Sequence, residues 1–395
     1  MSEVPIGRRV AYWRGRRNMS QQQFADRLGK SKSWVDKVER GVRSLDRVSV
    51  IHDVATVLAL DPDTLLAGAG RPEPAQSPGE AAQSPAETTD AVQAVRAALT
   101  RHPALTARPT APAPDHDRHR TRLAHADAVY GHGRYPALLG LLPDLLHNSH
   151  RMAVDQQVQT YRLATLALVK LGATDLAWLT ADRGLATAAG TDDPLLAAVA
   201  AAPLGHALRA AGRHRHAFET TIISAHQIAP LTTEEGTPAE RTACVMLLLQ
   251  AALAAAEHGD RPTVAELLDD AHAMTEPAGP ERAAVDATRI TAATALGENQ
   301  HAINLHETLT ASPGWPLLPL EHRAAHLVDL APAYVRSGDP AGAGRALLTA
   351  DRLVPAEVRV RPAGRAALAG VLNAQGRPDP HLLALADAAG VGGVR

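Results

Sequence analysis

Residues 20–41 read SQQQFADRLGKSKSWVDKVERG, and this stretch decides how the N-terminal end of the chain folds. Ser20 precedes Gln23 by three residues, which is the spacing of a capping box at the start of a helix. Gly29 predicts a left-handed turn that ends this helix, and Ser31 predicts the cap of the next one. The stretch therefore predicts two short helices joined by a tight turn.

Apolar residues on both sides extend this pattern to five helices. Ala25 is small because two helices must cross closely there, Gly41 ends the third helix, and Asp61-Pro62 starts a short fifth one. The residues predicted to face the core of this domain are Ile6, Val10, Trp13, Phe24, Ala25, Leu28, Val35, Val38, Val48, Ile51, Val54, Leu58, Leu65 and Leu66.

Positive charge is concentrated in the same segment. Residues 1–47 hold 12 Lys and Arg against 5 Asp and Glu, a net charge of +7, whereas the whole chain has −2, which leaves −9 for the rest. Three of the four lysines of the chain are Lys30, Lys32 and Lys37. A basic patch on an otherwise acidic chain favours a polyanionic partner, and the alternative is a solvated helix face.

The segment resembles the Xre-type helix-turn-helix domain of phage lambda repressor and Cro over about residues 4–68. It fits the pattern SQ-x-x-(apolar)-A-x-x-L-G-x-S-x-S-x-(apolar)-x-x-(apolar)-E-x-G. The resemblance implies a homodimer that binds double-stranded DNA at an operator with an inverted repeat. The residues that it places at the DNA are Gln21, Ser31, Lys32, Ser33, Trp34, Lys37, Arg40, Arg43 and Arg47.

The resemblance also implies a role for each of these residues. Lys32, Ser33 and Lys37 face base edges in the major groove, where lysine suits guanine O6 and N7 and serine suits either sense of hydrogen bond. Gln21 touches a phosphate and braces the recognition helix. The residues that follow the phosphates are Trp34, Arg40, Arg43 and Arg47.

Two further positions have structural meanings in this comparison. Arg14 and Glu39 occupy the positions of a buried ion pair, and Lys30 departs from the pattern because an apolar residue is usual there. A domain of this kind that has lost DNA binding would serve only for dimerisation. The density of basic residues argues against that alternative.

Composition favours an all-α, cytoplasmic protein. The chain of 395 residues has 3% aromatic residues, and β-branched runs are scarce, which favours closely packed helices over a sheet. Cys244 is the only cysteine, so no disulfide framework is possible, and we expect it in the core. No signal peptide is visible, and the longest apolar stretch, Ala243–Ala256, is interrupted by Gln250 and too short to span a bilayer. We therefore expect no membrane partner.

A change of composition separates the basic domain, residues 1–68, from the rest. Residues 69–118 are rich in Pro, Ser, Ala and Glu, and we expect a flexible linker there. Within it, Val92, Val95 and Leu99 have helical spacing, which predicts a short amphipathic helix near 90–100. The third region is residues 119–395.

This third region is an array of helical patterns with regular breaks. Its breaks fall at Gly133, Gly172, Gly212, Gly259, Gly297, Gly338 and Gly376, a period near 40 residues. Such a period indicates stacked helical hairpins. The hairpins resemble tetratricopeptide (TPR) repeats, whose period is 34 residues, so we expect longer helices or loops here. The resemblance implies a right-handed superhelix with a concave groove.

Xre-type domains fused to such arrays resemble the peptide-sensing regulators of Gram-positive bacteria, in which asparagines clamp the peptide. Asparagines are few and not periodic here, which argues against a peptide. The expected effector is therefore left as a small molecule or a peptide. The candidate pocket residues are polar side chains amid apolar helix faces, namely Tyr161, Arg162, His206, Arg209, Gln250 and Arg289. Taken singly, each is more often a surface residue or a satisfied buried residue than a ligand contact.

Signatures of catalysis and of metal binding are missing from the sequence. It has no HExxH, Walker loop or nucleophile elbow, and the closest histidine pairs, His147/His150 and His214/His216, have no cluster of acidic residues or cysteines. We therefore expect no enzyme, cofactor or metal. The main hypothesis is a ligand-responsive transcriptional regulator. The alternative is a scaffold whose repeats hold a protein partner, with DNA binding secondary.

Overall fold

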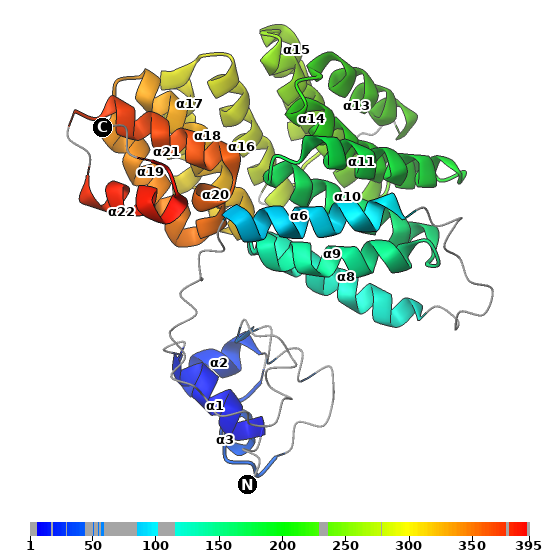
Figure 1. The fold of residues 1–395 in the computed structure, drawn as a ribbon, viewed down its shortest axis with the longest axis vertical. Coiled ribbons are helices and arrows are strands. Elements are labelled where there is room, and N and C mark those ends of the chain that lie inside the picture. The colour runs from blue at the N-terminus through cyan, green and yellow to red at the C-terminus, as the bar shows by residue number, and fades with distance from the viewer. Residues whose placement is uncertain are drawn as a thin grey trace. The chain divides into compact units, whose positions relative to one another are not determined.

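The computed structural model describes residues 6–16, 19–28, 30–43, 50, 54, 57–58, 85–101, 115–228, 236–277, 279–376 and 379–392. Every regular element within these ranges is a helix, which confirms the expected all-α class. The chain divides into two compact units, Met1–Ala81 and Ala82–Arg395 (Figure 1). We call the first unit the head and the second unit the array.

Three helices make up most of the described part of the head. These are α1 (Ile6–Arg16), α2 (Gln21–Arg27) and α3 (Lys32–Glu39). Their buried apolar residues, together with two from the predicted fourth helix, are Val10, Phe24, Ala25, Val35, Val38, Val54 and Leu58. Val48, Ile51, Leu65 and Leu66, which were also predicted for this core, lie outside the described residues, as does Gly29.

Two small residues allow the helices of the head to approach one another. Ala25 is fully buried, as predicted for a close helix crossing. The second is Gly7, which no sequence pattern marked: a Cβ atom there would lie 1.9 Å from the carbonyl oxygen of Val38 at the end of α3. Since that distance is far shorter than any van der Waals contact, α1 can pack here only with glycine at this position.

The array consists of helix pairs joined by short turns, as in TPR-like repeats. The six pairs are α8 (His116–Gly131) with α9 (Tyr135–Ser149), α10 (Val154–Lys170) with α11 (Thr174–Ala189), α12 (Pro194–Ala210) with α13 (His214–Ile228), α14 (Pro238–Glu257) with α15 (Arg261–Ala273), α16 (Pro280–Ala295) with α17 (Asn299–Ala311), and α18 (Leu320–Arg336) with α19 (Pro340–Leu353). The remaining elements are α6 (Pro85–Thr100), a 3-10 turn η1 (Trp315–Leu317), α20 (Pro355–Arg359), α21 (Pro362–Ala374) and α22 (Pro380–Ala389).

Each of the six pairs turns at a glycine that the sequence analysis marked as a break. The φ angles of these glycines lie between +68° and +81°, in the left-handed region that favours glycine. The paired helices are 13 to 20 residues long. Their length accounts for a period near 40 residues, as expected. The seventh predicted break, Gly376, follows the end of α21. Its φ angle is not in the left-handed region, unlike those of the other six.

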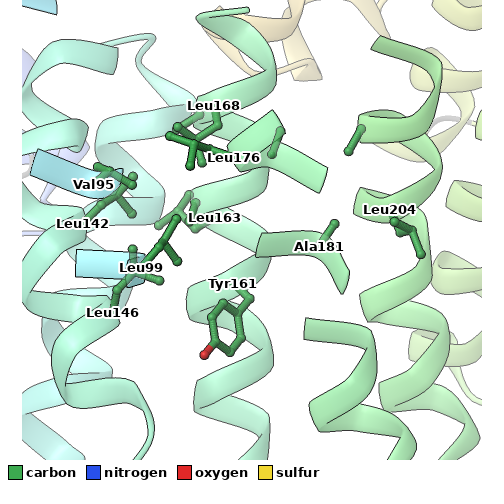
Figure 2. Packing of buried hydrophobic residues seen from close by; sticks show 14 of the residues in the cluster. Val95, Leu99, Leu142, Leu146, Tyr161, Leu163, Leu168, Leu176, Ala181 and Leu204 are labelled. Carbon is green, nitrogen blue, oxygen red and sulfur yellow. The ribbon is translucent and has the colours of Figure 1, made fainter. Parts of the chain in front are cut away.

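Helix α6 packs against the array. Val95 and Leu99 of α6 are buried in its largest apolar cluster, where Figure 2 shows them beside Leu142 and Leu146 of α9. Arg183 strengthens the contact, because its Nη1 donates a hydrogen bond to the carbonyl oxygen of Leu99. The structure thus assigns α6 to the array unit, whereas the sequence analysis placed it in the segment between domains.

The two ends of the array meet. A Cβ atom on Gly133, in the first turn, would lie 2.0 Å from Cγ1 of Val354, which caps α20. A Cβ atom on Gly172, in the second turn, would lie 3.0 Å from Cγ of Pro362 at the start of α21. In Figure 1 the short helix α20 lies beside the first helices of the array. We call this meeting place the closing contact.

Helix α14 is the longest helix among the described residues of the array, and its composition is largely apolar. It is the one described helix whose length and composition would allow it to cross a membrane, and most of it is buried within the unit. Its Cys244 is buried in the second apolar cluster, as expected for a core residue, and burial raises the pKa of its thiol.

Candidate nucleic-acid interface

Local hydrogen bonds set the start of α2 and of α3. Ser20 Oγ accepts from the backbone N–H of Gln23 at 3.2 Å, and Gln23 Oε1 accepts from the backbone N–H of Ser20 at 2.9 Å, which completes the predicted capping box. Ser31 caps α3 by accepting from the backbone N–H of Trp34 at 3.1 Å. Because each cap joins residues only three positions apart, the local sequence fixes where α2 and α3 begin.

Helix α3 presents one polar face and one apolar face. Val35 and Val38 are buried in the core of the head, and Lys32, Ser33 and Lys37 are exposed. This is the face that a recognition helix must leave open to reach base edges. Trp34 packs partly against the core of the head, so its expected contact with a phosphate stays a prediction.

An ion pair fixes α3 to the other two helices. Arg14 donates from Nε to Glu39 Oε1 at 2.5 Å and from Nη2 to Oε2 at 3.0 Å, and its Nη1 donates to the carbonyl oxygen of Met19 at 2.6 Å. Gln21 Nε2 donates to Glu39 Oε2 at 2.8 Å. The carboxylate of Glu39 therefore joins α1, α2 and α3, and its hydrogen bonds raise the pKa of Arg14.

Further basic residues surround the start and end of α3. Lys30, Arg40 and Arg43 are exposed, and Arg40 Nη2 pairs with Asp36 Oδ2 at 3.1 Å. Arg47, the remaining residue predicted to lie along the phosphates, is outside the described residues. The geometry gathers Lys32, Ser33 and Lys37 on one exposed face and gives Gln21 a bracing contact, while each predicted DNA contact stays a prediction.

The candidate effector residues separate into two groups. Arg209 and Gln250 come together, because Arg209 Nη1 donates to Gln250 Oε1 at 2.9 Å, and His206 lies one turn before Arg209 on α12. Tyr161, with 8% of its surface exposed, lies in the apolar core between α10 and α11 (Figure 2). Two others are paired elsewhere, Arg162 with Asp127 and Arg289 with Asp269.

The closing contact contains an ionic cluster that the sequence analysis did not identify. Lys170 Nζ pairs with Glu357 Oε1 at 2.8 Å and also with Glu321. Tyr135 donates a hydrogen bond to the same Glu357, and Arg361 Nη1 pairs with Glu357 Oε2 at 3.0 Å. The fully buried carboxylate of Glu357 on α20 thus joins α9 and α10, and Lys170 extends the cluster to α18.

Charge pairing controls the ionisation of this cluster. Burial alone would raise the pKa of Glu357, but Lys170 and Arg361 outweigh it and hold the pKa below its ordinary value. Burial alone would lower the pKa of Lys170, but Glu321 and Glu357 outweigh it and raise the pKa. Lys170 is the only lysine outside the head and stands in an apolar helix, which is the signal that would have revealed it.

Histidines of the array form ring contacts and no metal cluster. Among the residues that the structure describes, no group of three or more His, Cys, Asp or Glu could hold a metal ion. His147 and His150 stack edge to face, and His214 does so with His258 instead of His216. His306 Nδ1 and His326 Nε2 are 3.0 Å apart, and burial lowers the pKa of His326 to about 3.

A comparison with known protein families finds a match within the head. Residues 5–67 match the family described as a helix-turn-helix domain, so the head is a helix-turn-helix domain. No curated protein matches the chain by sequence.

Two solved structures show likenesses to the fold. Bacillus thuringiensis PlcR, solved in complex with the peptide PapR7 and DNA, is 12% identical and has a TM-score of 0.33, covering 78% of this chain and 99% of that one. A putative kinesin light chain from Podosopora anserina, described as nearly identical TPR-like repeats, is 21% identical and has a TM-score of 0.35, covering 52% of this chain and 97% of that one.

Proposed function

We propose that the chain is a sequence-specific DNA-binding transcriptional regulator, cytoplasmic and homodimeric, whose array binds a small-molecule or peptide effector. The observation that carries the proposal is the exposed face of α3. Lys32, Ser33 and Lys37 stand there together on a helix that Arg14 and Glu39 hold against the rest of the head. Rigid presentation of donors is what base readout requires, because a bidentate contact tolerates little misplacement.

The charge of the head supports the same proposal. A net charge of +7 over residues 1–47 attracts the phosphate backbone, and the exposed Arg43 and Lys30 extend the basic surface beyond the base-reading face. Phosphate contacts position such a domain, while base contacts specify the sequence. A homodimer follows from the small surface that one head offers, since a single module buries little DNA. Its half-sites would be about 34 Å apart, one turn of DNA.

The array supplies the second half of the proposal. Regulation requires an effector that binds one arrangement of the protein more tightly than another, because a ligand with equal affinity for both shifts nothing. The array holds buried charged side chains at the closing contact, where its ends meet. We propose that the effector acts on this junction.

Selection of bound sites from random duplex DNA tests the proposal. The full-length protein is used at about 150 mM salt, near physiological ionic strength. We expect an enriched inverted repeat, and Lys32→Ala should weaken binding to it by roughly 1–3 kcal/mol and relax specificity at one position of each half-site. Equal loss on random DNA would contradict base readout by Lys32.

The same selection distinguishes the alternative function. If no sequence is enriched and binding is weak and salt-sensitive, the head contributes only nonspecific affinity. A stable complex with a protein partner under those conditions would favour an interaction scaffold over a regulator.

A further inference from the structure

Arg209 on α12 has an unusual set of partners for a sheltered guanidinium. Its Nη1 donates to the neutral amide of Gln250, and its Nε atom is fully buried without a hydrogen-bond partner. No carboxylate oxygen among the described residues lies within 4.0 Å of the guanidinium. A buried donor without a partner is costly, and more so when it belongs to a charged group.

Two other arginines of the chain show what is missing. Arg14 and Arg359 each present the Nε and Nη2 edge of the guanidinium to a carboxylate, Glu39 in the first case and Asp351 in the second. In Arg209 the same edge has no partner among the described residues, while Nη1 is engaged. This edge is the one that binds the two oxygens of a carboxylate or phosphate side by side.

The surroundings of Arg209 favour a negative ligand. His206 lies one turn away on α12 and has its pKa lowered to about 3, first by burial and then by three cations, Arg209, Lys170 and Arg361. A neutral imidazole can still donate one hydrogen bond. Burial lowers the pKa of Arg209 to about 10, although Glu257 and Asp329 oppose this effect, so the guanidinium stays charged at neutral pH.

We propose that Arg209, His206 and Gln250 form a binding site for an oxyanion group, carboxylate or phosphate, of a small molecule. The Nε and Nη2 edge of Arg209 would bind two oxygens of the group, and His206 and the Nε2 amide of Gln250 would donate to it. This inference rests on the proposed function, in which the array binds an effector. It specifies the chemistry of that effector and selects three of the six candidate residues.

Charge interactions connect the site with the closing contact, and through them occupancy would reach the rest of the protein. Lys170 and Arg361 act on His206, and Asp329 acts on Arg209, so the cluster at the closing contact and the oxyanion site share one electrostatic environment. Arg361 Nη2 also pairs with Asp329 Oδ1 at 2.9 Å. An added negative charge would compete with the carboxylates for these cations and shift the balance of the closing contact.

Thermal unfolding of the full-length protein tests the site with two probes, inorganic phosphate and acetate, each compared with chloride at equal ionic strength. We expect a saturable rise in Tm, because a ligand that binds the folded state stabilises it by mass action. The rise should be lost in Arg209→Gln and retained in Arg215→Gln, a matched control that removes an exposed arginine paired with Glu219 on the neighbouring helix α13. A stronger response to phosphate than to acetate, or the reverse, identifies which oxyanion the site prefers.

A second variant keeps the test decisive if Arg209→Gln folds poorly. Gln250→Glu places a carboxylate beside Arg209, so it should raise Tm without any probe and abolish the response to both probes. An equal response in the wild type, Arg209→Gln and Gln250→Glu, or no saturable response in the wild type, would overturn the inference. Because no DNA is involved, the result stands apart from operator selection, and failure of one does not imply failure of the other.

Discussion

Removal of the Lys170 ammonium measures how strongly the closing contact holds the array together. Lys170→Met keeps a side chain of similar length but leaves Glu321 and the fully buried Glu357 with one cation fewer. Breaking a buried pair by removing one partner costs about 3–5 kcal/mol, because a charge stays buried without compensation. Glu357 keeps Arg361 at 3.0 Å and the hydroxyl of Tyr135, so we expect the low end of that range, about 3 kcal/mol.

Urea denaturation of the array, followed by far-ultraviolet circular dichroism, checks this value. With a slope of about 3 kcal/mol per molar urea, the midpoint should fall by about 1 M. Glu357→Gln and the double variant complete a mutant cycle with Lys170→Met. We expect the double variant to be more stable than the sum of the single losses predicts, by about 1–3 kcal/mol. Strict additivity, with a coupling below about 0.5 kcal/mol, would refute the claim that this pair closes the array.

Three further predictions follow from the head and the array. Gly7→Ala should lower the Tm of the head in calorimetry by an amount equivalent to about 1–3 kcal/mol or more, since its Cβ would meet the carbonyl oxygen of Val38, whereas Gly15→Ala on the same helix meets nothing within 4 Å and serves as the control. His326 is neutral in the fold, with a pKa of about 3 against 6.5 when unfolded. Its contribution to the free energy of unfolding is therefore complete above pH 6.5 and is lost as the pH falls, by about 1.4 kcal/mol per pH unit. The urea midpoint of His326→Phe should fall less steeply with acid than that of the wild type, and equal slopes would contradict this account. Arg43→Ala should weaken binding to all duplex DNA alike and reduce the salt slope by about one, and a sequence-dependent loss would instead place Arg43 at a base.

The head shows how far local sequence rules reach. The capping box at Ser20, the cap at Ser31 and the left-handed Gly41 are short-range features, and the structure has all of them. Gly7 was missed because its role depends on a contact with Val38, more than thirty residues away. A glycine within a helical pattern signals such a close approach only when its partner is known.

The array divides in the same way. Six of the seven glycines predicted as breaks do turn a helix pair, because each turn is a local event, whereas Gly376 does not. The closing contact joins Lys170 to Glu321 and Glu357, and no periodic pattern in the sequence reveals which repeats meet across such a distance. Among the candidate pocket residues, sequence alone did not separate Tyr161, a core residue, from Arg209, whose guanidinium lacks a carboxylate partner among the described residues.

The closing contact has a consequence for how the array unfolds. A linear array frays from its terminal repeats, because these have a neighbour on one side only. Here α8 packs on α18, and the turn after α8 rests on Val354, so the first and sixth helix pairs support each other. Amide hydrogen exchange in α8 and α18 should therefore rise together when Lys170 is replaced. Opening the closing contact would then free both ends of the array in a single step.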